Sequence, residues 1–283
     1  MQVASLWIHP VKSCRGCGVD RAELEEAGFR HDRRWMIVDS AGRFVSQREQ
    51  PDLATVSVTV MGDHLALTRP GHAALALPLD PGPAAPQQRV TVWDDAVDAR
   101  RASPDAARWL RSTLGLDGDV VWMPPGSARA VDPAYSQPCD RVSFADGFPL
   151  LVSSSSSLDA LNAHLVQPVP MERFRPNIVV SGSEAFAEDR WSVFRVGTVR
   201  CQAVKACARC VIVNTDPWTG ARSLEPLKTL SGFRTRDSKV YFAQNVIHAR
   251  ESIGQWVAVG DEVVVESWRE PADAPVFDSR VKE

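Results

Sequence analysis

The sequence predicts a mainly-β protein with α+β elements, organised as two β-barrel-like units. Short segments with the apolar patterns of strands outnumber segments with helical periodicity. No expected strand runs into a glycine-rich phosphate loop and a helix, the combination typical of a doubly wound sheet. Proline, glycine and serine cluster at Pro124–Gly126 and indicate a boundary. We therefore expect an N-terminal β-barrel-like domain at 1–124, a second β-barrel domain at 125–268 and a polar tail at 269–283.

The first unit is expected to contain strands and one helix. Residues 54–61 alternate valine with serine or threonine, which is the period-two pattern of a half-buried strand. The turn residues Ser40–Gly42 separate two apolar stretches and predict a hairpin. A helix is expected over Pro104–Leu114, because Ser103 can cap it and proline suits the first helical position. The expected strands are Val3–Val11, Arg34–Asp39, Arg43–Gln47, Ala54–Met61, His64–Arg69, Leu75–Leu79 and Arg89–Ala99.

The second unit is also expected to be mostly strands. A helix is predicted at Ser156–Leu165, because serines before it can cap its exposed N–H groups. A second, short helix is predicted at Glu225–Gly232. The expected strands are Pro149–Val152, Asn177–Ser181, Val193–Val204 with a break at Gly197, Val211–Thr215 and Val257–Glu266.

Composition excludes several classes of function. The 283 residues are 44% hydrophobic and 24% charged with a net charge of -3, so the chain has no overall basic field for nucleic acid. No apolar run approaches the roughly 20 residues that cross a bilayer. The N-terminus lacks the pattern of an export signal, so we expect a cytoplasmic location. Free thiols, metal ligands or reactive residues then become the favoured roles for the six cysteines.

The most informative local feature is a Cys-x-x-Cys pair within Lys205–Cys210, beside a lysine and an arginine. Nearby positive charge favours thiolate, the soft ligand that heavy transition metals prefer. The pair has three interpretations. It could be a dithiol redox pair, although no thioredoxin-like βαβ setting surrounds it, or half of a zinc site completed by Cys14 and Cys17. The third interpretation is a single functional cysteine with a structural neighbour.

Basic residues recur in short structured contexts, including Lys12, Arg33, Arg48 and Arg175. Arginine suits phosphate because its planar fork makes two parallel hydrogen bonds. Taken singly, each fits a solvated or ion-paired surface residue. Arg175 is the exception, since it precedes a proline that favours extended backbone and then enters a strand.

A loop at Asp146-Gly147 precedes the buried strand at Pro149–Val152. Functional residues often gather on such loops, because the strands behind them hold the loop ends in place. An aspartate followed by glycine is equally typical of a simple turn. The histidines form no ligand spacing, and His9 before Pro10 fits a structural role.

An ordered series of motifs resembles two-part MOSC (molybdenum cofactor sulfurase C-terminal domain) proteins, in which an N-terminal β-barrel domain precedes the MOSC domain. Within that group, the chain is most similar to the amidoxime-reducing component and its bacterial relatives. The resemblance runs from about Leu6 to Glu266. Its motifs are His9–Cys14, Asp32–Trp35, Gln47–Glu49, Phe174–Val179, Phe186–Trp191, Cys207–Cys210, Thr215–Gly220, Glu225–Leu227 and Phe242–Asn245.

The resemblance implies a molybdenum cofactor, Mo-molybdopterin, with Cys210 as the metal ligand. Lys12, Ser13, Arg33, Arg175 and Asn177 are implied to hold the pterin and its phosphate. Further residues are expected at the cofactor: Asp146, Gly147, Ala208, Arg209, Gln244 and Asn245. Two positions depart from some relatives. Ala145–Gly147 replaces a stretch with hydroxyl side chains, and Ala208 stands where some have serine.

The implied activity is two-electron reduction of N-hydroxylated compounds, such as amidoximes, hydroxylamines and N-hydroxylated bases, to amidines or amines. Cys210 and Asp146 are the expected catalytic residues, with Asp146 as acid or base. A separate electron donor is expected, ferredoxin-like or cytochrome-type with a flavin reductase, because no cysteine follows Cys210 to hold an iron–sulfur cluster. The alternative is a carrier protein that delivers molybdenum cofactor or sulfur through a persulfide on Cys210.

Overall fold

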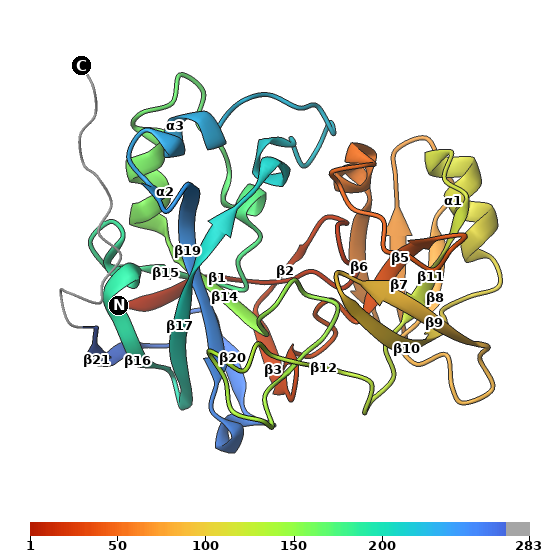
Figure 1. The fold of residues 1–283 in the computed structure, drawn as a ribbon, viewed down its shortest axis with the longest axis horizontal. Helices are drawn as coiled ribbons and strands as arrows, with labels where there is room; N and C mark the ends of the chain where they lie inside the picture. The colour runs from red at the N-terminus through yellow and green to blue at the C-terminus, as the bar shows by residue number, and fades with distance from the viewer. Residues whose placement is uncertain (270–283) are drawn as a thin grey trace.

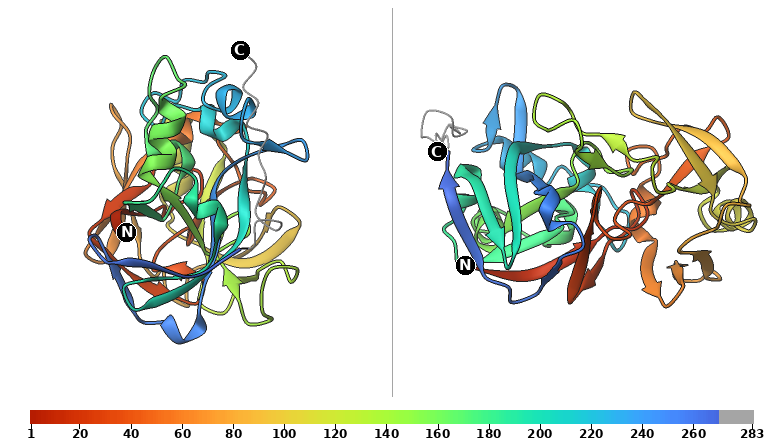
Figure 2. Two further views of the ribbon diagram at one scale, coloured as in Figure 1. Left: turned by 90° about the vertical axis from the view of Figure 1, so that its left-hand side faces the viewer. Right: turned by 90° about the horizontal axis from the view of Figure 1, so that it is seen from below.

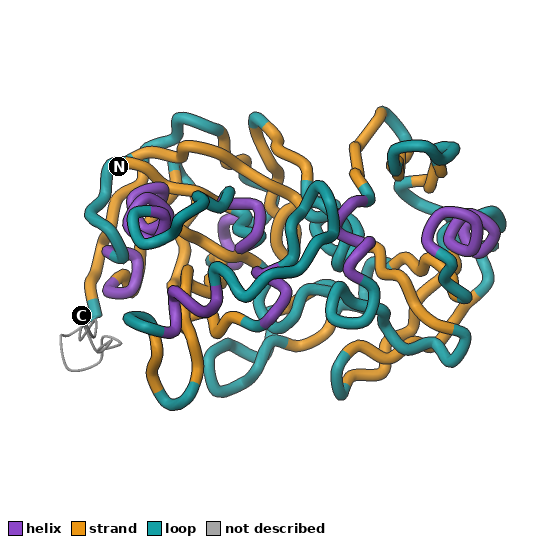
Figure 3. Tube along the Cα trace, turned by 90° about the horizontal axis from the view of Figure 1, so that it is seen from above, coloured by secondary structure: helices purple, strands orange, loops and turns teal. Residues whose placement is uncertain are grey.

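The computed structural model describes residues 1–269, so most of the predicted tail at 269–283 lies outside the described residues. Figure 1 shows two strand-rich parts side by side, with helices at their margins. Seen from above, strands take up more of the trace than helices in both parts (Figure 3). The predicted mainly-β class with two β-rich units is confirmed. No helix among residues 1–269 is long and apolar enough to cross a membrane.

A nine-stranded mixed sheet forms the larger part. Eight strands follow the order β2-β1-β15-β14-β19-β17-β16-β21, and β18 pairs with β19. All neighbours are antiparallel except β14 and β15. The strands are β1 Gln2–Ile8, β2 Cys17–Val19, β14 Leu150–Ser154, β15 Ile178–Ser181, β16 Trp191–Val196, β17 Val199–Arg209, β18 Thr235–Arg236, β19 Lys239–His248 and β21 Val263–Trp268.

The centre of the large sheet, at β14, β15 and β19, is buried on both faces, which explains its runs of apolar residues. Leu150 and Val152 of β14 point into one core, and Leu151 between them points into the other. The second core lies beneath helices α2 (Ser155–Asn162) and α3 (Leu227–Ser231). Ser154 caps α2, because its hydroxyl oxygen accepts the Ser157 N–H at 3.1 Å, as the serine-rich sequence predicted.

The start of the chain belongs to this larger part. Strand β1 pairs with β15 and runs along the sheet before the chain crosses to the smaller part (Figure 2). A three-stranded sheet, β20-β3-β4, packs against the same core. Its strands are β3 Arg21–Glu25, β4 Gly28–Phe29 and β20 Trp256–Ala258. Both ends of the described chain therefore stabilise one core.

The smaller part contains a four-stranded sheet, β5-β11-β10-β9, and a three-stranded sheet, β6-β7-β8. Both sheets and helix α1 (Ala106–Leu114) enclose one apolar core, and within residues 1–269 their strands pair as open sheets. The strands are β5 Trp35–Asp39, β6 Ser57–Met61, β7 His64–Thr68, β8 Leu75–Pro78, β9 Gln87–Val92, β10 Asp95–Arg101 and β11 Gly118–Trp122. A two-stranded ribbon, β12 Arg129–Ala130 with β13 Arg141–Val142, leads back to the large sheet.

Several expected elements differ from the structure. The segment predicted as a strand at Val211–Thr215 is a 3₁₀ helix, η4, over Val211–Asn214. Other 3₁₀ turns are η1 Pro51–Thr55, η2 Met171–Phe174, η3 Ala187–Arg190 and η5 Arg250–Ser252. The single strand expected at Arg89–Ala99 is a hairpin of β9 and β10 that turns at Trp93 and Asp94.

The remaining differences concern element ends. Helix α1 starts at Ala106, two residues later than predicted, and Asp105 before it makes no side-chain cap; the Ser103 hydroxyl accepts the Asp105 N–H at 3.2 Å just ahead of the helix. The second arm of the hairpin at Ser40–Gly42 joins its neighbours through isolated bridges, such as Val38 with Phe44, and forms no full strand. Residues 239–248, which the sequence analysis did not assign to a strand, form the long central β19.

Candidate functional site

An open cavity with about 920 Å³ of empty space lies where the two parts meet. The larger part supplies five segments: the loop after β1, the loop before β14 with the start of that strand, the residues before β15, the end of β17 with the turn after it, and Asn245 of β19. Arg33 stands just before β5. The smaller part supplies Phe44 and Ser46–Arg48, which follow β5.

Most of the predicted site residues gather at this cavity. Eleven of the twelve line it: Lys12, Ser13, Arg33, Asp146, Gly147, Arg175, Asn177, Ala208, Arg209, Cys210 and Asn245. Gln244 does not. Its side chain is buried on the opposite face of β19, where the amide nitrogen donates to Asp189 at 2.7 Å. Since neighbouring strand residues point to opposite faces, only one of Gln244 and Asn245 can reach the cavity.

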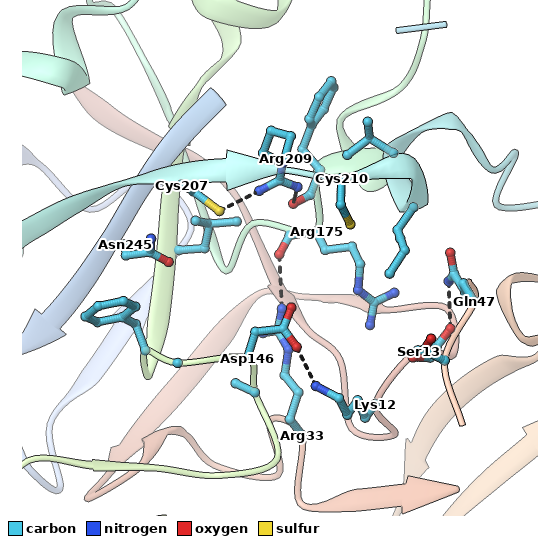
Figure 4. A pocket seen from close by; sticks show the side chains of 18 of the residues that line it. Lys12, Ser13, Arg33, Gln47, Asp146, Arg175, Cys207, Arg209, Cys210 and Asn245 are labelled. Atoms are coloured by element: carbon cyan, nitrogen blue, oxygen red, sulfur yellow. Dashed lines mark hydrogen bonds and ion pairs between the residues drawn. The ribbon is translucent and has the colours of Figure 1, made fainter. Parts of the chain in front are cut away.

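Two sulfur atoms face the cavity, and each accepts a hydrogen bond from an arginine. Arg48 Nη2 lies 3.2 Å from Cys210 Sγ, and Arg209 Nη1 lies 2.9 Å from Cys207 Sγ. Figure 4 shows both thiols at the end of β17, with Arg209 between them. Cys210 is the first residue past the strand and precedes η4, so its side chain projects from a strand end that the sheet fixes.

A buried network holds the two arginines expected at the cofactor. Arg33 donates from Nη1 to Asp32 at 2.6 Å and to Asn177 Oδ1 at 3.0 Å, and from Nη2 to the Arg175 carbonyl at 3.2 Å. Arg175 Nη1 donates to the Cys14 carbonyl at 2.6 Å. Burial, together with the charge of Arg33, lowers the pKa of Arg175 to about 10. Both guanidinium groups are therefore fixed before any ligand binds, which reduces the entropy lost on binding.

Lys12 and Asp146 form an ion pair across the cavity wall. Lys12 Nζ lies 2.5 Å from Asp146 Oδ1 and 2.8 Å from the Phe144 carbonyl oxygen. Burial lowers the pKa of Lys12 despite this partner. Desolvation by the surrounding protein raises the pKa of Asp146. The charge and hydrogen bond of Lys12, together with the charges of Arg48 and Arg33, lower it by more, so the net shift of this pKa is downward. Asp146 is therefore a carboxylate at neutral pH, and 70% of its side-chain surface remains exposed.

The loop that carries Asp146 is anchored in the smaller part. The Phe144 ring is fully buried in the core on the outer face of the four-stranded sheet, beside Met36 and Val38. Its amide donates to the Arg33 carbonyl at 3.0 Å. The packing of Phe144 thus places Asp146 two residues later at the junction of the two parts.

Three of the predicted cofactor residues have strained backbone. Ser13, Arg33 and Arg175 have φ values of 69°, 50° and 56°, so the extended backbone expected at Arg175 before its proline is wrong. Residues other than glycine seldom adopt this left-handed region, and where they do they often lie at functional sites. The hydrogen bonds described above hold two of these backbones in place. The third backbone, at Ser13, is held by Gln47, whose side-chain amide nitrogen donates to the Ser13 carbonyl at 2.6 Å.

The charge of the cavity fits an anionic, phosphate-bearing cofactor. Six cationic side chains and one carboxylate line it. The Nε atoms of Arg173 and Arg209 are buried with no hydrogen-bond partner, so donors remain for a ligand. The thiol of Cys210 is a soft donor of the kind that heavy transition metals prefer. The chain therefore offers the donor set that a molybdenum–pterin cofactor requires: one sulfur ligand and several charged hydrogen-bond donors.

Two residues beside the predicted set had been given no role. Arg48 stands in the Gln47–Glu49 motif, yet nothing in the sequence pointed to its contact with Cys210. Trp93 contacts Asp146 through its indole nitrogen at 3.3 Å. It stood inside an expected strand, which concealed the turn that brings it to the cavity.

The zinc interpretation finds no support in the structure. Within residues 1–269, no group of three or more histidine, cysteine, aspartate or glutamate side chains is placed to hold a metal ion. Burial raises the pKa of Cys14 to about 12 and that of Cys17 to about 11. Both shifts oppose the thiolate form that zinc requires.

The fold and the site together define a class of protein. It is β-rich and has two parts, and the cavity at their junction is lined by cationic side chains and thiols. Residues 1–117 match the MOSC N-terminal beta barrel domain, and residues 140–264 match the MOSC domain. The chain belongs to the family of amidoxime-reducing components.

Three relatives illustrate this membership. Mitochondrial amidoxime-reducing component 1 of Mus musculus is 36% identical, over 83% of this chain and 72% of the relative. Component 1 of Homo sapiens is 35% identical over the same shares. Mitochondrial amidoxime reducing component 2 of Bos taurus is 34% identical, over 92% of this chain and 82% of the relative.

Proposed function

We propose that this protein is a molybdenum-cofactor-dependent oxidoreductase that reduces N-hydroxylated compounds, including amidoximes, hydroxylamines and N-hydroxylated bases, to amidines or amines. The observation that carries the proposal is the Cys210 thiol, which faces a cavity lined by six cationic side chains and one carboxylate. The names of the relatives specify amidoxime reduction, and that activity is what we transfer to this chain.

The chain itself would bind and orient the cofactor and the substrate. Cys210 would supply the sulfur ligand to molybdenum. Lys12, Ser13, Arg33 and Arg175 would hold the pterin and its phosphate through charge-assisted hydrogen bonds, with Asn177 fixing Arg33 from behind. The cofactor, when bound, supplies the two-electron chemistry that converts N–OH and two protons to N–H and water.

Asp146 has a narrower role than the sequence indicated. Because its ion pair with Lys12 keeps it ionised, it is suited to accept a hydrogen bond from the substrate rather than to donate a proton. The donor beside it is the Lys12 ammonium, whose lowered pKa brings it closer to the range of a proton donor at neutral pH.

Electrons would come from a separate protein, either ferredoxin-like or cytochrome-type with a flavin reductase. The sequence-based expectation of a bacterial, cytoplasmic protein stays a prediction, since the relatives are named as mitochondrial proteins of animals.

The test compares the wild-type protein with a Cys210→Ala variant, both produced in a host that makes molybdenum cofactor. Molybdenum per chain and reduction of benzamidoxime by a chemical reductant are measured. We expect about one molybdenum per wild-type chain with turnover, and at least a 100-fold loss of turnover in the variant. Wild-type protein that carries molybdenum but reduces no benzamidoxime would point instead to the carrier role. Equal molybdenum in both proteins would refute the ligand role of Cys210.

A further inference from the structure

Trp93 occupies a backbone position that does not suit it. The β9–β10 hairpin pairs Val92 with Asp95, so Trp93 and Asp94 alone form its turn. Trp93 has a φ of 55°, whereas Asp94 is not among the residues with positive φ. Two-residue hairpin turns with a positive φ at only the first central position strongly favour glycine there. A bulky aromatic residue at this position weakens the turn, which implies that its side chain has another purpose.

The contacts of Trp93 reach the cofactor cavity. Its indole nitrogen donates to Asp146 Oδ1 at 3.3 Å, the same oxygen that accepts the Lys12 ammonium. The guanidinium carbon of Arg48 lies 5.0 Å from the centre of its ring, within range of a cation–π interaction. The Phe44 ring lies 4.9 Å away, and the Lys12 ammonium lies 5.7 Å from the centre of the Trp93 ring.

Two of the residues that Trp93 contacts, Arg48 and Asp146, act inside the cavity. Arg48 donates to the Cys210 sulfur, and Asp146 pairs with Lys12. Trp93 belongs to the smaller part, whereas Asp146 and Cys210 belong to the larger part. Trp93 therefore contacts both Arg48, which donates to the proposed metal ligand, and Asp146, the carboxylate of the proposed substrate site.

We propose that Trp93 is a positioning residue: it holds Arg48 against Cys210 and Asp146 at the cavity mouth, and so allows the smaller part to complete the cofactor site. This inference rests on the proposed function. The strained backbone of the turn is a consequence of this role, because an aromatic ring at the tip of the hairpin reaches both Arg48 and Asp146.

A substitution to glycine separates this role from a structural one. Trp93→Gly places the favoured residue in the turn, so we expect the melting temperature of the cofactor-free protein to stay within about 3 °C of wild type or to rise. Molybdenum retained per chain after dialysis should fall about 10-fold, as observed when residues supporting a metal ligand are lost. If Trp93 were only structural, the melting temperature would fall and the remaining folded protein would keep its metal.

Trp256→Gly is the matched control. Trp256 is also half-exposed and stacks on an arginine, Arg21, at 4.8 Å, but it lies in β20, and Arg21 does not line the cavity as Arg48 and Asp146 do. We expect this variant to lose some thermal stability, because glycine weakens a strand, and to retain wild-type molybdenum and turnover.

Trp93→Phe sharpens the test, because it keeps a ring for Arg48 and removes the donor to Asp146. We expect near-wild-type molybdenum content and a several-fold lower kcat for benzamidoxime per bound molybdenum. Equal molybdenum and equal kcat in wild type and Trp93→Gly would overturn the positioning role alone. Wild-type protein without molybdenum would overturn both this role and the proposed function.

Discussion

The chain contains two Cys-x-x-Cys pairs whose environments differ in almost every respect. Cys14 lies in the core of the smaller part and Cys17 packs against the core of the larger part. Cys207 and Cys210 face the cavity, and an arginine donates to each sulfur. The same spacing therefore produces structural thiols in one place and a candidate metal ligand in the other. The surrounding charges and packing decide the chemistry of a thiol, and the spacing alone does not.

The largest expected difference between the pairs is in thiol reactivity. A thiol with a pKa of about 11, such as Cys17, is only about 0.03% ionised at pH 7.5, against about 10% for an ordinary thiol of pKa 8.5. We expect Cys17 to react with iodoacetamide on the order of 100-fold more slowly than Cys210 in the cofactor-free protein, as measured by peptide mass spectrometry. The exposed Cys139 is the internal standard. Equal labelling of Cys17 and Cys210 would remove the contrast between the two pairs.

A smaller difference is expected in stability. Cys14 is fully buried in the core, so Cys14→Ala should lower the free energy of unfolding by about 1–2 kcal/mol. Cys207→Ala alters a half-buried thiol at the cavity, where we expect a change below about 0.5 kcal/mol. Urea denaturation of the cofactor-free proteins measures both values. A larger loss for Cys207→Ala than for Cys14→Ala would reverse the assignment of structural and functional pairs.

The site was more predictable than the elements that build it. The family resemblance specified eleven of the residues that line the cavity: nine stand in the ordered motifs, and Asp146 and Gly147 stand in the loop before β14. Gln244 was included wrongly, since a motif does not say which of two neighbouring strand residues faces inward. Arg48 and Trp93 were given no role, because their partners, Cys210 and Asp146, are far away in sequence and only the fold brings them together.

The incorrect elements have related causes. The run Val211–Asn214 is apolar and mostly β-branched, which is typical of a strand, yet it forms a 3₁₀ turn directly after Cys210. The hairpin turn at Trp93 contains no glycine or asparagine, so its local signal was missing. In both places the sequence departs from local preference beside the cavity, as expected where function rather than stability determines the residue.

The smallest predicted effect concerns His9, which lies beneath the first cysteine pair. A Cβ atom on Gly16, between Cys14 and Cys17, would lie 2.3 Å from His9 Nδ1, so this turn packs directly on the imidazole. Burial, reinforced by the charges of Arg33 and Arg175, lowers the pKa of His9 well below 6.5. Below pH 6.5 the unfolded chain therefore binds a proton at His9 that the folded chain does not, and stability falls as the pH falls.

The slope from this one group is about 1.4 kcal/mol per pH unit between its two pKa values. The His9→Gln variant can still donate to the Pro176 carbonyl. Between pH 6.5 and 5.5, we expect its free energy of unfolding to fall by about 1 kcal/mol less than that of wild type. The measurement is urea denaturation of both proteins at the two pH values. His31 and His248, whose pKa values are also lowered, contribute equally to both proteins and cancel in the difference. Identical pH dependence in the two proteins would mean that His9 is already able to take up a proton in the folded state. The turn of the first pair would then be looser than its packing indicates, and the contrast with the second pair would rest on Cys14 alone.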